Sequence, residues 1–340
     1  MKTIAFYLPQ FYEIPENDLW WGKGFTEWTN VKKAKPRFLG HYQPRAPLRD
    51  YYYNLLDLDV HKWQINLAKQ YGLDGFCYYH YWFKGKKLLE KPIELRNQCK
   101  EIDFPYCLCW ANESWTRSWD GKDQEVLMRQ EYGDESDWKE HFNYLLPFFK
   151  NKNYLNIKDK PIFVIYRPAS IPNLNKMLSL WNEWAQSEGL LGIHFVEMLT
   201  IFEDKSDFLF DAAIEFEPMY TLKKLIGNTT SLHQEKKDFH LSYDFVWKRI
   251  LNRQIKEREN IYKGAFVDWD NSPRKKESAL IVKGANPDKF KKYLLQHSKD
   301  TDFLFINAWN EWAEGTYLEP DEKYGYKYLE ALMEIKKSHF

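Results

Sequence analysis

The sequence lacks an excess of charge of either sign. Its 340 residues include 49 Lys and Arg and 49 Asp and Glu, so the net charge is zero at pH 7. Nucleic-acid-binding surfaces are strongly basic, and we therefore expect no nucleic-acid partner. The sequence also lacks an apolar run approaching the roughly 20 residues that a membrane-spanning helix needs, so we expect no membrane span.

Signals for export and for metal binding are also missing. The N-terminal run MKTIAFYLPQF is broken at Pro9 and is too short for the core of a signal peptide, so we expect a cytoplasmic protein. Among four cysteines, Cys107 and Cys109 form a Cys-x-Cys pattern that lacks the spacing of a zinc knuckle. We predict reduced, buried thiols, and we expect neither a metal nor a cofactor.

A glycine-rich phosphate-binding turn is absent after the first predicted strand, at 3–9. The sequence there continues as LPQFYEIPENDLWWGKGFTEW, which is aromatic and has no Gly-x-Gly-x-x-Gly pattern. Open, doubly wound sheets that bind nucleotides normally carry such a turn at this point. Its absence disfavours that fold.

Apolar runs that predict β-strands alternate with helical patterns along the whole chain. The runs are nearly continuous, which is typical of parallel strands covered on both faces. Strands are expected at 3–9, 75–83, 105–111, 161–167, 193–199, 212–218, 263–270 and 302–309. Helices are expected at 59–72, 87–100, 134–150, 173–188, 242–258, 287–299 and 326–338. This alternation predicts an α/β fold, a (β/α)8 TIM barrel with long βα loops, as a single catalytic domain over residues 1–340.

Aromatic residues are abundant, at 18% of the chain, with 15 Trp and 23 Tyr. The C–H face of a sugar ring packs on an aromatic face while its hydroxyl groups bond to polar neighbours. The composition therefore slightly favours an oligo- or polysaccharide substrate.

Acids, amides and aromatic rings follow nearly every predicted strand. Because the active site of a TIM barrel lies at the C-terminal ends of its strands, we expect these side chains to line one cleft. The residues predicted to bind substrate are Tyr7, Gln10, Glu27, Trp28, Tyr79, His80, Trp82, Trp110, Asn112, Trp115, Tyr166, Arg167, Glu215, Asp268, Trp269, Asp270 and Asn310.

The last predicted strand runs into NAWNEWAEGT, which places Glu311 and Glu314 three residues apart. Carboxylates at this spacing on a turn lie on one side of it. A pair of carboxylates can cleave a glycosidic bond, one as acid and the other as nucleophile or base. Glu113, in the stretch WANES, is an alternative acid, with Glu311 then the nucleophile of a retaining pair about 5 Å apart.

Several longer motifs resemble the WbsX-type proteins of bacterial surface-polysaccharide gene clusters. They include HYQPR, DGFCYYHYWF, PYCLCWANESWTRSWDG, VDWDNSPR and NAWNEWAEGTYLEPD, and they span almost the whole chain. That group has been labelled glycosyltransferase and is similar to glycoside hydrolase family 99, the endo-α-1,2-mannosidases and mannanases. The NEWHEGT segment of family 99 aligns with NEWAEGT here.

The resemblance implies roles for the two glutamates. Glu311 would be the base that acts on the substrate's own 2-hydroxyl, giving a 1,2-anhydro-sugar, and Glu314 the acid that protonates the leaving group. We expect Glu314 to have a raised pKa and Glu311 to be ionised. The histidine between the two glutamates of family 99 is Ala313 here, so any polar contact of that histidine is lost.

The implied function is a glycoside hydrolase of α-linked, manno-configured or related bacterial surface glycans. One alternative is a glycosyltransferase of O-antigen or capsule assembly, for which the Asp-x-Asp pattern of Asp268 and Asp270 is the sequence signal. Another is a non-catalytic glycan-binding barrel, which would keep the aromatic rings and lose the acids.

Overall fold

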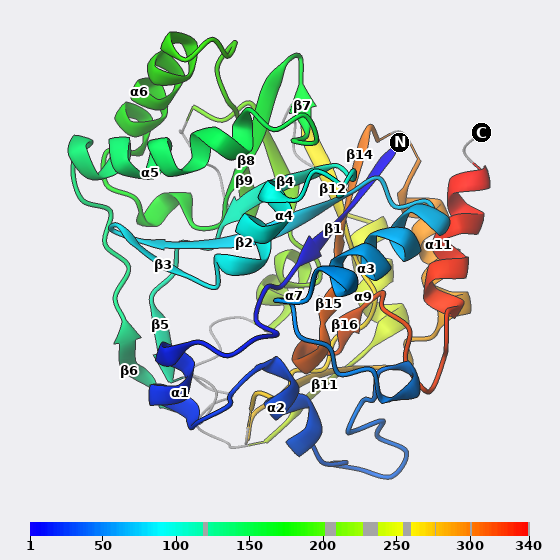
Figure 1. Ribbon diagram of the computed structural model, residues 1–340. Coiled ribbons are helices and arrows are strands. Elements are labelled where there is room, and N and C mark those ends of the chain that lie inside the picture. Colours follow the sequence, from blue (N-terminus) through cyan, green and yellow to red (C-terminus); the bar gives the residue numbers. More distant parts are fainter. Residues whose placement is uncertain are drawn as a thin grey trace.

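Parallel strands form a closed barrel in the computed structural model, in which β1 pairs with both β2 and β14 (Figure 1). The structure describes residues 1–117, 122–200, 209–226, 237–253, 260–275, 277–299 and 301–338. The eight barrel strands, in order around the ring, are β1 (Lys2–Tyr7), β2 (Gly75–Phe83), β4 (Tyr106–Trp110), β8 (Lys160–Ile165), β9 (His194–Leu199), β10 (Ala212–Glu215), β12 (Ile261–Phe266) and β14 (Phe303–Asn307). The predicted (β/α)8 barrel is confirmed.

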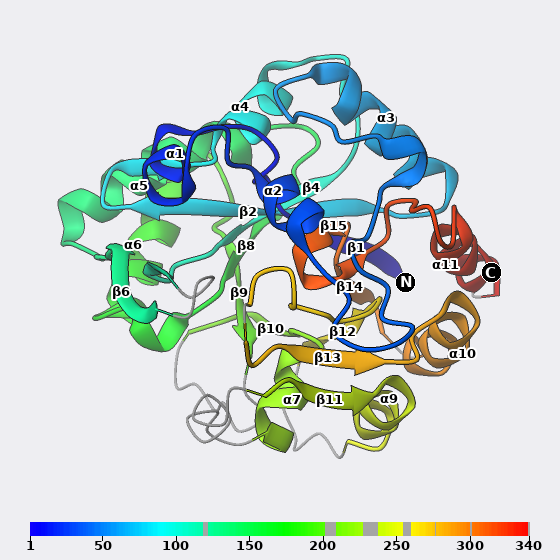
Figure 2. The same ribbon diagram turned by 90° about the horizontal axis from the view of Figure 1, so that it is seen from below.

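Helices surround the barrel on its outer side (Figure 2). They are α3 (Leu58–Gln70), α4 (Lys91–Gln98), α5 (Glu135–Phe149), α6 (Leu174–Ser187), α7 (Met219–Ile226), α9 (Tyr243–Leu251), α10 (Pro287–His297) and α11 (Lys327–Ser338). Within the described ranges, no helix has both the length and the apolar character that crossing a membrane would require.

Two predicted helices differ from the observed ones. The prediction of a helix from residue 87 is wrong at its start, because Lys86–Leu88 forms strand β3, antiparallel to β2. Lys84 and Gly85 have positive φ angles of 45° and 86°, which makes the tight turn of this hairpin. The helix predicted to end at residue 258 ends at Leu251, and residues 254–259 lie outside the described part of the chain.

The connections after the strands are longer and more structured than those before them. The β1–α3 connection contains α1 (Pro15–Trp21), α2 (Glu27–Lys33) and η1 (Leu48–Asp50). Further small elements are β5 (Trp115–Arg117), β6 (Lys122–Met128), β7 (Asn156–Ile157), η3 (Pro168–Ser170), β11 (Phe239–Ser242), β13 (Leu280–Lys283), β15 (Asn310–Glu311), η4 (Trp312–Glu314) and β16 (Thr316–Tyr317). Except for β7, they gather with α1 and α2 around the C-terminal ends of the barrel strands, which is where a TIM barrel places its active site (Figures 1 and 2).

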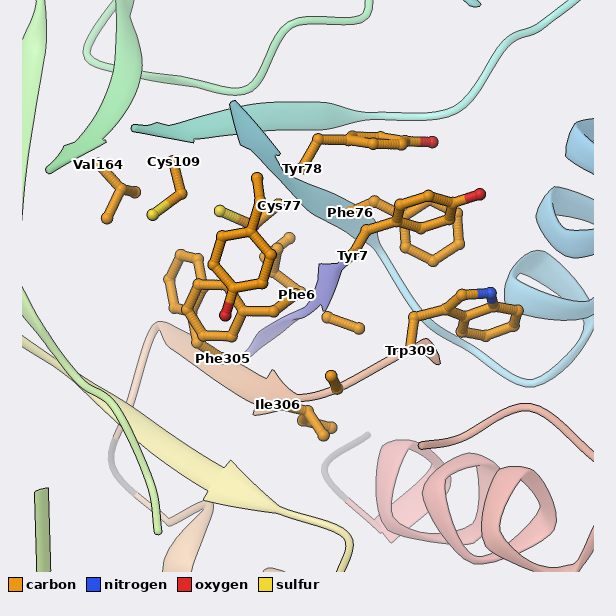
Figure 3. Packing of buried hydrophobic residues seen from close by; sticks show 14 of the residues in the cluster. Phe6, Tyr7, Phe76, Cys77, Tyr78, Cys109, Val164, Phe305, Ile306 and Trp309 are labelled. Atoms are coloured by element: carbon orange, nitrogen blue, oxygen red, sulfur yellow. The ribbon is translucent and has the colours of Figure 1, made fainter. Parts of the chain in front are cut away.

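Side chains of the barrel strands alternate between the interior and the layer beneath the helices. In Figure 3, Phe6, Cys77 and Phe305 pack with neighbouring strands inside the barrel, and the Phe6 and Phe305 ring centroids are 5.7 Å apart. Tyr7 points the other way, and its hydroxyl donates to Gln64 of α3 at 2.6 Å. This two-residue period of a strand decides which residues can reach a cleft at the barrel mouth.

Gly264 of β12 is predicted to be essential for the packing of β12 against β10. A Cβ atom at this position would lie 1.6 Å from the carbonyl oxygen of Glu215, and backbone cannot yield that space without moving a strand. Gly264→Ala should therefore lower the free energy of unfolding by about 3 kcal/mol or more, measured by urea denaturation.

Gly325→Ala is the control for this substitution. A Cβ there would meet nothing within 4 Å, and the φ of 56° should cost about 1 kcal/mol. Equal losses in the two variants would contradict the close approach of β10 to Gly264.

Candidate active site

A cleft of about 820 Å³ opens at the C-terminal ends of the barrel strands. Its walls combine aromatic rings with acids and two arginines, Arg167 and Arg274. The residues named from the sequence that line this cleft are Gln10, Tyr79, Asn112, Glu113, Trp115, Tyr166, Arg167, Trp269, Glu311 and Glu314.

The other residues predicted to bind substrate do not line the cleft. They are Tyr7, Glu27, Trp28, His80, Trp82, Trp110, Glu215, Asp268, Asp270 and Asn310. The alternation of side chains between the two faces of a strand explains why the residues on β2 do not all line the cleft. Tyr79 and Tyr81 line the cleft, whereas His80 and Trp82 point to the opposite side of the sheet. There, His80 Nε2 lies 2.8 Å from His141 Nε2, and the Trp82 ring stacks on the ring of His141.

The same alternation explains why Trp110 does not line the cleft. Its indole nitrogen donates to the backbone oxygen of Trp82 at 3.3 Å. Trp28 lies on the buried side of α2, where its indole nitrogen donates to the carbonyl of Tyr53 at 2.8 Å. Asn310 accepts from the backbone N–H of Leu8 at 2.8 Å and so ties β15 to the end of β1. These three side chains have structural partners away from the cleft.

Two of the predicted acids are held by arginines outside the cleft. Glu215 faces away from the barrel interior and lies 2.6 Å from Arg253. Asp268 lies 2.8 Å from Arg45. The sequence showed that acids follow these strands, but it did not show that a buried arginine binds each of them.

One arginine binds three glutamates at the edge of the cleft. Arg274 Nη2 lies 2.7 Å from Glu27 Oε1 and 3.0 Å from Glu311 Oε2, and Arg274 Nη1 lies 2.6 Å from Glu314 Oε1. We refer to these four side chains as the carboxylate cluster. Although Glu27 does not line the cleft, this arginine joins it to the two residues that do.

Local backbone geometry places the two cleft glutamates together. Glu311 ends the short strand β15, and Glu314 ends the 3-10 turn η4 that follows. Gly315 closes the turn with a φ of 66°, a left-handed conformation that glycine adopts without strain. The turn therefore presents both carboxylates to the same arginine.

A buried hydrogen-bond network holds the turn from the side opposite the cleft. Glu319 accepts from the indole nitrogen of Trp312 at 2.7 Å, from the hydroxyl of Tyr53 at 2.8 Å and from the amide of Gln64 at 2.7 Å. Burial raises the pKa of Glu319 to about 7, although these hydrogen bonds lower it. Trp312 thus anchors η4 to α3 and to the β1–α3 connection.

The carboxylate cluster is buried and has more negative than positive groups, and both features raise the pKa values of Glu311 and Glu314. Burial raises the pKa of Glu311 to about 8; the charge of Arg274 opposes the shift, and the charges of Glu314 and Glu27 add to it. Burial likewise raises the pKa of Glu314, again against Arg274. The expectation that the pKa of Glu314 alone is raised is corrected: the pKa values of both glutamates are raised, because both are buried and one guanidinium is shared by three carboxylates.

Glu113 has a different environment from the two buried glutamates. Its side chain is 48% exposed, and its carboxylate lies 2.5 Å from Arg167 Nε. The neighbouring Asn112 accepts from the backbone N–H of Arg167 at 2.7 Å, which fixes the ends of β4 and β8 to each other. Glu113 therefore lines the same cleft as Glu311 but stands at its solvent-exposed part.

Two buried donors at the cleft have no hydrogen-bond partner among the described residues. They are the side-chain nitrogens of Gln10 and Trp269. Because buried donors are normally paired, both are candidates to bind a substrate hydroxyl. Across the described ranges, no group of three or more His, Cys, Asp or Glu side chains is arranged to hold a metal ion.

The set of substrate-binding residues predicted from the sequence did not include Arg274 and Tyr81, which both line the cleft. Tyr81 lies two residues after Tyr79, so the strand period was the signal that would have placed both on one face. Arg274 lies in the motif VDWDNSPR, and the accumulation of acids at strand ends was a signal that a buried cation must lie near them.

Solved structures of glycoside hydrolases have the same fold as this chain. A GH99 endo-α-mannosidase from Bacteroides thetaiotaomicron aligns with 99% of this chain and 96% of its own, at a TM-score of 0.56 and 12% identity. A protein described as glycoside hydrolase-like aligns with 98% of this chain and 93% of its own, at a TM-score of 0.62 and 12% identity. At this level of identity, the likeness establishes the common fold.

A comparison of the sequence with family models identifies the family of this chain. The family model described as glycosyltransferase WbsX matches residues 3–332, and the chain belongs to this family. The protein WxcX of Xanthomonas campestris pv. campestris, in strains ATCC 33913 and B100, is 40% identical over 342 residues, which cover 96% of this chain. The chain spans 48% of the length of these relatives.

The raised pKa of Glu311 predicts a pH dependence of stability. Between its ordinary pKa of 4.5 and the raised value of about 8, the folded protein binds more protons than the unfolded chain. The free energy of unfolding should therefore fall as the pH rises through this window, by up to about 1.4 kcal/mol per pH unit for one proton. Glu311→Gln removes this titration and should reduce the slope by the contribution of one proton, measured by urea unfolding over the same window.

Glu27→Gln is the matched variant, because it retains Glu311 and removes a charge that raises the pKa of Glu311. Its slope should persist and shift to lower pH. A slope that is the same in wild type and Glu311→Gln would show that Glu311 does not titrate in this window.

Proposed function

We propose that this chain is a glycoside hydrolase that cleaves α-linked, manno-configured or related bacterial surface glycans with Glu311 and Glu314. The observation that carries the proposal is the sharing of Arg274 by these two buried glutamates in a cleft with aromatic walls. The size of the cleft, about 820 Å³, suits several sugar rings. The membership in the WbsX family and the fold shared with a GH99 endo-α-mannosidase support it.

The reaction needs one carboxylate that accepts a proton and another that donates one. In the first step, Glu311 takes the proton of the substrate's 2-hydroxyl, and that oxygen attacks the anomeric carbon. The glycosidic bond breaks, and its oxygen takes a proton from Glu314. In the second step, Glu314 takes a proton from water, which opens the 1,2-anhydro-sugar, and Glu311 returns its proton to the 2-oxygen.

The raised pKa values in the carboxylate cluster are suited to these proton transfers. Because the pKa values of both glutamates are raised by burial, the pair can retain one proton near neutral pH, and the proposed reaction requires that this proton lie on Glu314 and that Glu311 be ionised when substrate is bound. Both carboxylates lie on one turn, so they can reach adjacent substrate atoms on one side of the sugar ring. This arrangement favours attack by the substrate's own hydroxyl over attack from the opposite face.

A glycosyltransferase of O-antigen or capsule assembly is the second candidate, and the description of the family favours it. The Asp-x-Asp pattern gives this candidate little support. Asp268 is bound by Arg45, and Asp270 accepts from Gln43 and is bonded to His41, so both carboxylates already have protein partners. A non-catalytic glycan-binding barrel would have no use for two buried glutamates with raised pKa values.

Conservative substitutions of the two glutamates test the proposed roles. Glu311→Gln and Glu314→Gln retain shape and remove proton transfer, so each should lower turnover by about 100-fold or more while sparing binding. An aryl glycoside with a good leaving group needs no acid, so it should partly rescue Glu314→Gln and not Glu311→Gln. The measurement is release of sugar from the organism's own surface polysaccharide and from the aryl glycoside.

Glu113→Gln separates the ordinary retaining pair from the proposed one. It should retain most activity, and a loss rescued by the aryl glycoside would instead assign the acid to Glu113. Full turnover in both Glu311→Gln and Glu314→Gln would refute the proposal, and saturable binding of a sugar nucleotide would favour the transferase.

Trp115 should contribute to glycan binding by stacking on a sugar ring. It is half-buried at the cleft, where its ring centroid lies 5.3 Å from that of Tyr81. Trp115→Ala should weaken oligosaccharide binding by about 1 kcal/mol, or about 5-fold in Kd, measured by calorimetry with Glu314→Gln as the background to prevent cleavage. Trp184→Ala, on α6 and away from the cleft, is the matched control, and equal affinities in the two variants would exclude stacking on Trp115.

A further inference from the structure

The motif HYQPR, at 41–45, lies outside the cleft and yet bonds to the turn that carries Glu314. Arg45 is 8% exposed and does not line the cleft. Its Nη1 donates to the backbone oxygen of Gly315 at 2.9 Å, and its Nη2 donates to Asp268 at 2.8 Å. One guanidinium thus joins the end of η4 to the loop that follows β12.

Asp270 forms the second link between the same two loops. Its backbone N–H donates to the carbonyl of Glu314 at 2.7 Å. Its carboxylate accepts from Gln43 Nε2 at 2.7 Å and lies 2.7 Å from His41 Nε2. The 41–45 segment therefore binds the side chain of Asp270, and the backbone N–H of Asp270 in turn binds the carbonyl of Glu314.

The hydrogen bonds of His41 define which of its nitrogens carries the proton. The backbone N–H of Arg37 donates to His41 Nδ1 at 3.1 Å, so Nδ1 is the acceptor. Nε2 therefore carries the hydrogen that is donated to Asp270. The ring of Phe38 stacks on the imidazole at 4.4 Å and fixes its plane.

The contact between Arg45 and the turn leaves no space for adjustment. A Cβ atom at Gly315 would lie 2.9 Å from Arg45 Cζ and 3.0 Å from Asp270 Cβ. The turn is thus in direct contact with both residues. A change at Arg45 must move the backbone next to Glu314 or leave a void behind it.

Asp270 also lies between two residues of the cleft. Trp269 lines the cleft directly before it, and Arg274 follows in the same loop. The carboxylate of Asp270 accepts from the backbone N–H of Ser272 at 3.0 Å, and the backbone N–H of Arg274 donates to Asn271 at 3.1 Å. The loop that contains Trp269 and Arg274 therefore folds around the side chain of Asp270, which the 41–45 segment binds.

We propose that Arg45, with His41 and Gln43 acting through Asp270, positions Glu314 for proton donation. This inference rests on the proposed function, because it assigns the 41–45 segment to the acid of that reaction. Arg45 is a positioning residue and does not touch the substrate. Its contribution is to fix the carbonyls of residues 314 and 315, and thereby the distance from the Glu314 carboxyl group to the glycosidic oxygen.

The test is whether Arg45→Met reproduces the kinetic signature of Glu314→Gln. Arg45→Met should lower kcat on the natural glycan by about 10- to 100-fold with little change in KM, because a small displacement of a proton donor has a large effect on rate. The loss should be much smaller on an aryl glycoside with a nitrophenolate leaving group. Arg45→Lys, which keeps the charge but cannot bind two acceptors in a fixed fork, should show an intermediate loss.

Arg96→Met is the matched control. Arg96 is 2% exposed and binds the carbonyl of Phe104 at the opposite end of the barrel. It should lower stability and leave the ratio of activities on the two substrates unchanged. Equal losses on both substrates in Arg45→Met, or no loss on either, would overturn the positioning role.

A crystal structure of Arg45→Met separates this inference from the proposed function. The distance from Asp270 N to Glu314 O should increase beyond hydrogen-bonding range, and an unmoved turn would overturn the inference whatever the activity. Failure of Glu314→Gln to alter turnover would instead refute the proposed function. If Arg45→Met does not fold, Gln43→Leu removes one donor to Asp270, keeps Arg45 and carries the same two readouts with a smaller effect.

Discussion

The site depends on the binding of one guanidinium, that of Arg274, by three carboxylates. Glu27 comes from the start of α2, Arg274 from the loop after β12, and Glu311 and Glu314 from the turn after β14. Without Arg274 the three buried carboxylates would have no cation in this cluster, and a buried charge without a partner is strongly destabilising. The three loops must therefore lie next to one another, and the elements around the barrel mouth hold them in that arrangement.

The turn that carries the two cleft glutamates is fixed on both of its sides. On one side, Glu319 binds the indole of Trp312, and on the other, Arg45 and Asp270 bind the carbonyls at its end. The cluster itself holds more negative groups than positive ones, so its carboxylates repel one another when they are ionised. Rigid attachment of the backbone keeps them at their positions in spite of this repulsion, which is the usual condition for a shifted pKa in a site.

The fold could be predicted from the sequence because continuous apolar runs and helical periods are local signals. The clustering of Glu311 and Glu314 could also be predicted, since both lie within one short motif. The direction of each side chain was predicted less well. Tyr79 and Tyr81 reach the cleft, but His80 and Trp82 lie on the opposite face of β2. The sequence shows that side chains alternate, but not which of the two sets faces the cleft.

Long-range partners could not be predicted at all. Asp268 and Asp270 follow a strand as a catalytic acid would, yet Arg45 and Gln43, more than 200 positions earlier, bind them. The contact between Arg45 and Gly315 joins positions separated by 270 residues. Nothing in the local pattern of either segment indicates the other, so these partners became evident when the closed barrel brought their loops together.

The pairing of β14 with β1 has a consequence for the synthesis of the protein. The strand that closes the barrel is also the strand that leads into Glu311 and Glu314, and its first partner, Lys2, was made about 300 residues earlier. Loops with such large separations close late, after local helices and neighbouring strands have formed. A nascent chain thus has no carboxylate pair until its last strand is available, and any activity of the site begins only when the barrel is complete.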